Sequence, residues 1–198
     1  KFLGNIRETD AVLHVLRCFE DGNIIHVDGS VDPIRDKEVV DIELQLKDLE
    51  TVEARAEKAG KAARTGDKEA IKASAFYAEV TKTLGEGRSA RSMELDEYQE
   101  EWMREMQLLT AKPILYVCNV DEASVVKGNE FVDRVREMAT AEGAGIMVIG
   151  AAIEAEIAEL EDLEERAMFL EDMGLSEPGV AKLIRAAYNL LELQTYFT

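Results

Sequence analysis

The sequence predicts an α/β protein, in which a parallel β-sheet core carries an inserted, coiled-coil-like α-helical arm. Three short apolar runs are typical of buried parallel strands: residues 11–16, 114–118 and 146–149. Between the first two runs, residues 37–108 are rich in Glu, Lys and Ala, contain no proline and show no strand pattern. We therefore expect residues 1–36 and 110–198 to form the sheet core and residues 37–109 to form the arm.

Length and charge limit what the protein can be. The chain has 198 residues, 46% of them hydrophobic, which allows one core and an appendage. No apolar run approaches the roughly 20 residues that a membrane helix needs, so we expect a cytoplasmic protein without a membrane partner. The net charge of −18 argues against a protein that coats nucleic acid with its whole surface. Any contact with RNA therefore has to be local.

The first apolar run, residues 11–16, suits a central parallel strand. We expect His14 within it to be a hydrogen-bonded core residue and not a ligand. Cys18 and Cys118 each close a predicted strand. We expect them to be buried thiols rather than a redox pair, because a cytosolic protein experiences a reducing environment.

Three helices are predicted in the arm. The first carries a heptad-like seam formed by Ile42, Leu46 and Leu49. The chain turns at Gly66, and a third helix begins after the glycines at 85 and 87. The stripes of the second and third helices are Ala73, Phe76, Val80 and Leu84, and then Leu95, Tyr98, Trp102, Met106 and Leu109. We expect these stripes, aromatic residues included, to pack the helices together.

Basic residues cluster around the predicted turn at Gly66. The cluster consists of Lys58, Lys61, Arg64, Lys68 and Lys72. One interpretation is the ordinary solvated face of a helix pair, and the other is a local RNA contact.

A strand–helix–strand unit follows the arm. Phe131, Val135 and Met138 lie on one face of a helix that Gly143 ends, between the second and third strands. A right-handed crossover in a parallel sheet follows. A closing helix is predicted from about Pro178 to residue 191, with an apolar stripe of Val180, Leu183, Ile184, Ala187 and Leu190.

Polar or small residues follow the second and third strands. Asn119, Val120, Asp121 and Glu122 come directly after the second strand. Gly150, Ala151 and Ala152 come after the third strand. Ligands of open parallel sheets lie beyond the carboxyl ends of the strands, so the two segments form a candidate binding site. The alternative interpretation of the Asn119 segment is a turn or helix cap.

Seven segments of the chain resemble one protein family in the family's own order. They are residues 5–11 (NIRETDA), 15–21 (VLRCFED), 31–34 (VDPI), 48–51 (DLET), 109–113 (LTAKP), 151–156 (AAIEAE) and 193–198 (LQTYFT). Together they resemble the YchF family, a branch of the Obg-like P-loop GTPases. The resemblance implies part of a P-loop NTPase sheet with an inserted arm. It also implies hydrolysis of ATP, with GTP as a second nucleotide, and association with the ribosome, with the large subunit and ribosomal RNA as partners.

The phosphate-binding part of such a protein is not found in the chain. No G-x-x-x-x-G-K-S/T motif occurs in it. We therefore expect a fragment that lacks the phosphate loop and the TGS domain of the family and is inactive alone. Mg²⁺ would be held by residues outside this chain, and no catalytic or metal-binding residue is predicted within it.

The Asn119 segment departs from the guanine-reading motif of GTPases. They read guanine with Asn-Lys-x-Asp, whose carboxylate accepts from the base, whereas Val120 and Glu122 replace the lysine and aspartate here. The Asn119 amide can pair with N6 and N7 of adenine, and Val120 can cover the ring. A backbone N–H of residues 150–152 would complete the pocket. The resemblance therefore implies a site that accepts ATP at least as well as GTP.

Two glutamates after the third strand are candidates for a catalytic pair. Glu154 and Glu156 could form an acid/base pair, but their distance from the expected phosphate position favours helix-end solvation. Two other functions stay open at this point. One is a non-catalytic module that binds ribosomal RNA or protein through the arm, and the other is a guanine-specific GTPase. The oligomeric state is not predicted.

Overall fold

The computed structural model describes residues 2–26 and 29–194, so Lys1 and residues 195–198 of the last family-like segment lie outside the described residues. The chain forms two compact units. The first unit contains residues 1–10 and 38–112, and the second contains residues 11–37 and 113–198. Residues 1–10 thus belong to the same compact unit as the helices of the arm. None of the helices in the described part is long and apolar enough to cross a membrane.

The second unit is built on a parallel sheet. Its described strands are β1 (Val12–Arg17), β2 (Ile114–Asn119) and β3 (Gly145–Ile149), in the order β1-β2-β3. Leu16 pairs with Cys118 across the first interface, and Cys118 pairs with Val148 across the second. The α/β class, the parallel sheet and all three expected strands are confirmed.

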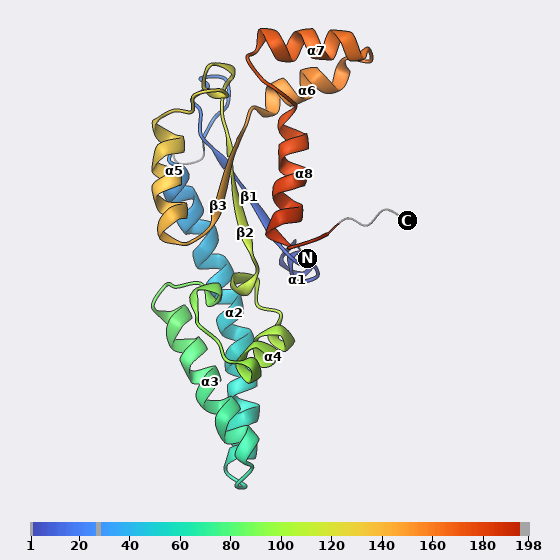
Figure 1. Ribbon diagram of the computed structural model, residues 1–198. Coiled ribbons are helices and arrows are strands. Elements are labelled where there is room, and N and C mark those ends of the chain that lie inside the picture. Colours follow the sequence, from blue (N-terminus) through green and yellow to red (C-terminus); the bar gives the residue numbers. More distant parts are fainter. Residues whose placement is uncertain (1, 27–28, 195–198) are drawn as a thin grey trace. The chain divides into compact units, whose positions relative to one another are not determined.

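Helices cover both faces of this sheet, as Figure 1 shows for α5 and α8. α5 (Glu130–Ala141) packs Val132, Val135 and Ala139 against the face that carries Tyr116 and Cys118. α8 (Gly179–Leu190) packs Leu183, Ala186 and Leu190 against the opposite face, which carries Leu115, Val117 and Ile149. β2 is therefore buried on both sides, which explains its unbroken apolar sequence.

The expectation that the first strand is central is wrong for the described sheet, because β1 lies at its edge. Leu13 is 42% exposed and Val15 is 61% exposed on the face that α8 covers elsewhere. His14 lies on the other face, where its ring packs 5.8 Å from that of Tyr116. In the described sheet, this apolar run therefore does not mark a strand that is flanked by two others and buried on both faces.

The apolar stripe expected for α8 is confirmed in part, because Leu183 and Leu190 pack on the sheet. Ala186 packs on the sheet, whereas Val180 is 46% exposed and Ile184 is 54% exposed. Apolar residues occupy more than one side of this helix, so the sequence pattern alone did not select the side that faces the sheet. Two further helices, α6 (Ala151–Glu159) and α7 (Leu163–Asp172), precede α8.

The first unit is helical. It contains α1 (Phe2–Arg7), most of α2 (Pro33–Ala63), α3 (Lys68–Gly85) and α4 (Glu97–Met106), with short 3₁₀ turns η1 (Ala90–Ser92) and η2 (Leu109–Ala111). Gly66 has a φ of +86°, which confirms the turn between α2 and α3. The buried residues of its core are Val52, Ala73, Phe76, Tyr77, Val80, Leu84, Ala90, Met103, Met106 and Leu108. The stripe predicted for α3 is confirmed, whereas Tyr98 of the α4 stripe is 69% exposed.

The seam predicted for α2 is wrong at two of its three positions. Ile42 is 56% exposed and Leu46 is 58% exposed. The buried side of the helix instead runs through Gln45, Asp48 and Val52. Two of these three residues are polar, so an apolar-periodicity argument could not find this side.

Asp48 is fully buried and holds the segment that leads from the arm back to β2. Its carboxylate accepts hydrogen bonds from the Leu109 N–H at 2.9 Å, the Thr110 N–H at 2.7 Å and the Thr110 hydroxyl at 2.8 Å. Burial raises the pKa of Asp48, although the hydrogen bonds from Thr110 and Leu109 oppose the shift. One side chain of α2 thereby satisfies three donors of η2.

We expect Asp48→Ala to lower the free energy of unfolding by about 1–3 kcal/mol, because it leaves buried N–H donors unpaired. Denaturant titration followed by circular dichroism measures the loss. The matched control is Glu50→Ala on the same helix, whose exposed carboxylate pairs with Lys47, and we expect a change within about 0.5 kcal/mol. Equal losses in the two variants would contradict the role assigned to Asp48.

Candidate functional site

Three loops leave the sheet at its carboxyl edge, one after each strand. Backbone hydrogen bonds continue the strand pairing to this edge. The Cys18 N–H donates to the Asn119 carbonyl at 2.8 Å, and the Val120 N–H donates to the Ile149 carbonyl at 2.9 Å. The segments starting at Cys18, Val120 and Gly150 therefore begin side by side, as expected for a site beyond the ends of parallel strands.

Asn119 joins two of these loops through its side chain. Its Oδ1 accepts a hydrogen bond from the Ala151 N–H at 2.9 Å, across 32 positions of sequence. Ala151 is the first residue of α6, whose first N–H groups have no acceptor within the helix. With Oδ1 oriented toward Ala151, the Nδ2 group of Asn119 is the part of the amide that remains to donate to a ligand.

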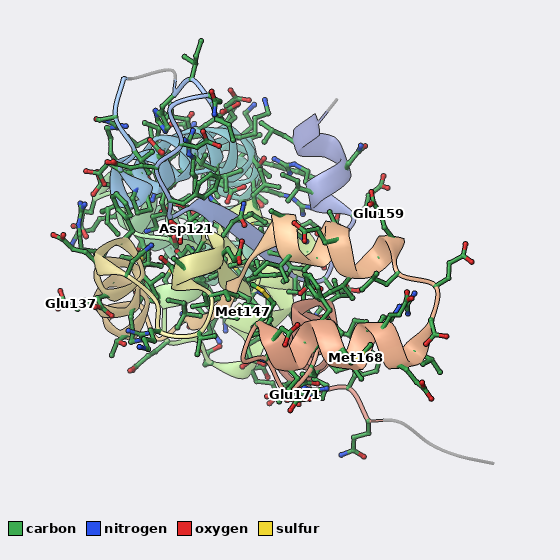
Figure 2. The ribbon with its side chains drawn as sticks, turned by 90° about the horizontal axis from the view of Figure 1, so that it is seen from above. Asp121, Glu137, Met147, Glu159, Met168 and Glu171 are labelled. Atoms are coloured by element: carbon green, nitrogen blue, oxygen red, sulfur yellow. The ribbon has the colours of Figure 1, made fainter. Side chains whose placement is uncertain are left out.

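The other residues of the Asn119 segment have different environments. Val120 is only 3% exposed and packs in the core beneath α5, which does not match its expected role as cover for a base. Asp121, labelled in Figure 2, accepts from the Ser124 N–H at 3.0 Å and caps η3 (Glu122–Ser124). Glu122 is exposed at the start of that turn. Glu122 is thus the carboxylate of this segment that faces solvent without a capping role.

Asn129 is a residue of this edge that the sequence analysis missed. Its Nδ2 donates to the Cys18 carbonyl at 2.8 Å and to the Ser124 hydroxyl at 3.2 Å, while its Oδ1 accepts from the Val132 N–H at 3.1 Å. Asn129 therefore caps α5 and ties the loop after β2 to the end of β1. Its position just before an amphipathic helix indicates a cap, but nothing local indicates the contact with Cys18.

The residues after β3 form the second wall of the edge. Gly150 precedes α6, and a Cβ added to it would lie 3.0 Å from Cδ1 of Ile153. Ala151 and Ala152 are exposed. Because Asn119 uses the Ala151 N–H, the Ala152 N–H is the next helix-terminal donor available to a ligand.

The loop after β1 is organised by Arg17. Its guanidinium donates to the carbonyls of Phe19 at 3.1 Å and Ile24 at 3.1 Å. Farther along, His26 Nε2 lies 2.8 Å from Asp36 Oδ2 in the first turn of α2. A cavity of about 410 Å³ is lined by residues of this loop, but neither Asn119 nor Ala151 lines it. We therefore do not assign this cavity to the base.

Cys18 and Cys118 are both buried and not joined in a disulfide, which confirms the expectation of buried thiols. The hydrogen bond with Cys118, together with burial, raises the pKa of the Cys18 thiol far above its usual range. A raised pKa keeps the Cys18 thiol protonated, whereas the hydrogen bond with Cys18 lowers the pKa of the Cys118 thiol. The pair packs the sheet against α5.

Glu154 serves the start of another helix. Its carboxylate accepts from the Gly179 N–H at 2.6 Å and the Val180 N–H at 3.0 Å, the first donors of α8. A Cβ on Gly179 would lie 2.8 Å from both Glu154 Oε1 and Ile149 Cγ1, so the contact requires glycine. Glu156 is exposed. The two glutamates therefore do not converge on one site, which agrees with a helix-end role for Glu154.

The basic cluster lies at the α2–α3 turn of the first unit. Its members Lys58, Lys61, Arg64, Lys68 and Lys72 are all exposed. Lys61 forms an ion pair with Glu57 at 2.7 Å, and Lys72 lies 5.9 Å from the centre of the Tyr98 ring. Six basic and three acidic residues occupy positions 55–72, so the turn is locally positive in an acidic chain.

Comparison with known proteins finds similar sequences. A Bacillus subtilis (strain 168) protein described as the ribosome-binding ATPase YchF is 48% identical over 200 residues, covering 100% of this chain. A Haemophilus influenzae protein of the same description is 46% identical over 198 residues. The chain is similar to YchF proteins along its whole length. It spans 54% of the length of each of these YchF relatives.

A solved YchF structure agrees with the fold. The structure of the Schizosaccharomyces pombe YchF GTPase matches with a TM-score of 0.84 and 29% identity, covering 96% of this chain and 52% of that protein. The expected fold, an α/β parallel sheet with an inserted helical arm, is therefore confirmed. No family model matches the chain.

We expect Glu154→Ala to lower the free energy of unfolding by about 0.5–2 kcal/mol, the usual effect of removing a helix cap. The loss follows because Gly179 and Val180 would keep their N–H groups without the carboxylate. Thermal unfolding measures it. Glu156→Ala on the same helix changes the charge equally without touching α8, so an equal loss in that control would rule out the capping role.

Proposed function

We propose that this chain is the base-reading half of a nucleotide-binding protein that hydrolyses ATP, with GTP as a second substrate, and associates with the ribosome. The proposal rests on the hydrogen bond between Asn119 Oδ1 and the Ala151 N–H, which joins the two loops where a base would lie. The descriptions of the YchF relatives, a ribosome-binding ATPase and a GTPase, support the reaction class and the partner. In this proposal residues 1–36 and 110–198 form the nucleotide-binding domain and residues 37–109 form the arm.

In this proposal, one contact provides affinity for either purine base and another contact selects between the two bases. Asn119 Nδ2 donates to N7, which both purines carry, so this contact supplies affinity without choosing a base. The Ala152 N–H offers a second donor at the same edge. The choice then depends on Glu122, whose side chain is one methylene longer than the aspartate that reads guanine. Adenine has no N1–H or N2 amine to donate to that carboxylate, so ATP binds at least as well as GTP.

The phosphate chemistry is supplied by residues outside this chain. The sequence carries no phosphate-binding loop, and that loop provides most of the charge neutralisation in phosphoryl transfer. Mg²⁺ is accordingly held together with the phosphates by residues that this chain does not contain. We propose that the chain alone hydrolyses neither nucleotide.

In the intact protein, we expect Glu122→Asp to shift preference toward GTP by about 1–3 kcal/mol, or about 5- to 150-fold, as a charge-assisted bond to guanine is gained. Asn119→Ala should weaken ATP and GTP equally. Calorimetric titration of both nucleotides measures these changes. Val120→Lys, which would restore the lysine of the guanine motif, is unsuitable as a test variant because a lysine at this buried position would destabilise the core.

The control for this titration is Glu156→Asp, the same change at an exposed glutamate of α6. Its ATP to GTP ratio should equal that of the wild type. A wild type that clearly prefers GTP, or a ratio that Glu122→Asp leaves unchanged, would show that this loop does not read the base as proposed.

A guanine-specific GTPase is the second candidate for the nucleotide. It is favoured by the description of the S. pombe protein as a GTPase. In that case Glu122 itself would accept from guanine, and the wild type would prefer GTP in the titration above. The non-catalytic module is the third candidate, and an intact protein that binds neither nucleotide would favour it.

We propose that the arm contacts ribosomal RNA and that this RNA belongs to the large ribosomal subunit. The α2–α3 turn of the arm presents five exposed basic side chains that can approach phosphates. The rest of the chain is acidic, so this turn is where attraction to RNA is strongest.

We expect charge reversal of Lys58, Lys61 and Arg64 to glutamate to weaken ribosome association while leaving nucleotide affinity unchanged. Co-sedimentation with ribosomes over a salt series measures this, and the salt dependence should decrease as phosphate contacts are lost. The matched control reverses Lys82, Arg88 and Arg104, three exposed cations of the same unit. If both triple variants sediment like the wild type, the cluster is only a solvated helix face.

A further inference from the structure

The loop after β2 is closed by hydrogen bonds of its own. We call residues 120–129 the β2–α5 loop. The Ser124 N–H donates to Asp121 Oδ1 at 3.0 Å, and the Gly128 N–H donates to the Ser124 carbonyl at 2.7 Å. Gly128 has a φ of +75°, a conformation that glycine adopts without strain. Ser124 is thus the centre of the loop, and its exposed fraction is only 9%.

Asn129 attaches this loop to the end of β1. Its Oδ1 accepts from the Val132 N–H at 3.1 Å, and this bond fixes the orientation of the amide, because a backbone N–H requires an acceptor. The Nδ2 group therefore faces the other way, where it donates to the Cys18 carbonyl at 2.8 Å and to the Ser124 hydroxyl at 3.2 Å. One side chain thus joins a helix start, a strand end and the centre of the loop.

The other side of the β2–α5 loop has apolar contacts. Val125 packs in the core with α5, and its Cγ2 lies 3.5 Å from the place that a Cβ of Gly150 would occupy. Val126 Cγ2 lies 3.7 Å from the corresponding place at Gly174. These contacts bring the loop close to the segments after β3, whereas the Asn129 amide attaches it to β1. Hydrogen bonds depend strongly on angle, so the polar attachment is the one that determines how the loop is oriented.

Glu122 lies in the part of the loop that these bonds control. It begins η3, two residues before Ser124, and its side chain is exposed. The Val125 N–H donates to the Glu122 carbonyl at 3.4 Å, which closes η3 as a single turn that includes Ser124. Asn119, in contrast, is held separately by the Ala151 N–H. The position of Glu122 relative to Asn119 therefore depends on how Ser124 is held.

We propose that Asn129 is a positioning residue that sets the base preference of the site by fixing Glu122 relative to Asn119. This inference rests on the proposed function, in which Asn119 binds either purine and Glu122 decides between them. While Asn129 holds the turn, the side chain of Glu122 cannot withdraw to make room for guanine. Without the Nδ2 bonds the turn gains freedom, and Glu122 can adjust to accept from guanine.

Asn129 itself does not contact the base in this proposal. Its Nδ2 group has two hydrogens, and the Cys18 carbonyl and the Ser124 hydroxyl accept them. Its Oδ1 is directed to the first turn of α5. Asn129 therefore acts through Glu122, so its effect on base preference must disappear when the Glu122 carboxylate is absent.

The test measures the ATP and GTP affinities of the intact protein by calorimetric titration. Asn129→Ser keeps a good cap for α5 but removes the Nδ2 group that holds Cys18 and Ser124. We expect the ratio of affinities to shift toward GTP by about threefold to tenfold, the effect of losing about one hydrogen bond. Asn189→Ser, the same change at an exposed asparagine of α8, is the control and should leave the ratio within about twofold.

A double-mutant cycle separates positioning from a general loss of structure. In a Glu122→Ala background, Asn129→Ser should change the ratio by less than about twofold, because no carboxylate remains to be repositioned. Ser124→Ala removes one Asn129 bond from the opposite side, so we expect a smaller shift in the same direction. Hydrogen exchange followed by mass spectrometry should be faster over residues 120–129 in Asn129→Ser than in the wild type.

Equal shifts with and without the Glu122 carboxylate, or an unchanged ratio in both Asn129→Ser and Ser124→Ala, would overturn the positioning role. Failure of the proposed function has a different signature. In that case the intact protein binds neither nucleotide, or Glu122→Asp also leaves the ratio unchanged, and this inference falls with it. A ratio that responds to Glu122→Asp but not to the two loop variants would contradict the positioning role alone.

Discussion

The burial of β2 on both faces is the constraint on which the second unit depends. Five of its six residues are buried, with α5 against one face and α8 against the other. Parallel pairing on both edges fixes its register against β1 and β3. A shift by one residue would turn every side chain to the opposite face, so the position of Asn119 is determined by the packing of the whole strand.

The same constraint shapes the candidate site. β2 ends at the half-buried Asn119, the next residue, Val120, still belongs to the core, and the side chains of Asp121 and Glu122 are exposed. Asn119 therefore does two things at once: it binds the first N–H of α6 and presents its amino group at the edge. Asn129 repeats this arrangement on the other side by holding the end of β1. The loops are thus linked before any ligand arrives, which reduces the ordering that binding requires.

Local patterns in the sequence predicted much of this fold. The three strands, the turn at Gly66 and the buried stripe of α3 all follow from patterns within a few neighbouring residues. The failures concern properties that depend on distant parts of the chain. The apolar run of β1 could not reveal an edge position, and the buried side of α2 was hidden because Asp48 satisfies donors 61 and 62 residues away.

The candidate site shows the same division. The position of the Asn119 segment beyond a buried strand could be predicted, but its bond to Ala151 spans 32 residues and leaves no local pattern. Likewise, Glu154 looked like a helix-end acid, yet it caps a helix that begins 25 residues later. Sequence reasoning therefore placed these residues at the carboxyl edge of the sheet and missed the partners that orient them.

Amide hydrogen exchange at Ala151, followed by NMR, tests the central claim most directly. The first N–H of a helix has no acceptor within the helix and exchanges quickly unless something else binds it. If Asn119 links the two loops, the Ala151 amide is protected beside a fast-exchanging Ala152 amide, and Asn119→Ala removes the protection. An Ala151 amide that exchanges as fast as that of Ala152 in the wild type would show that Asn119 does not link the two loops.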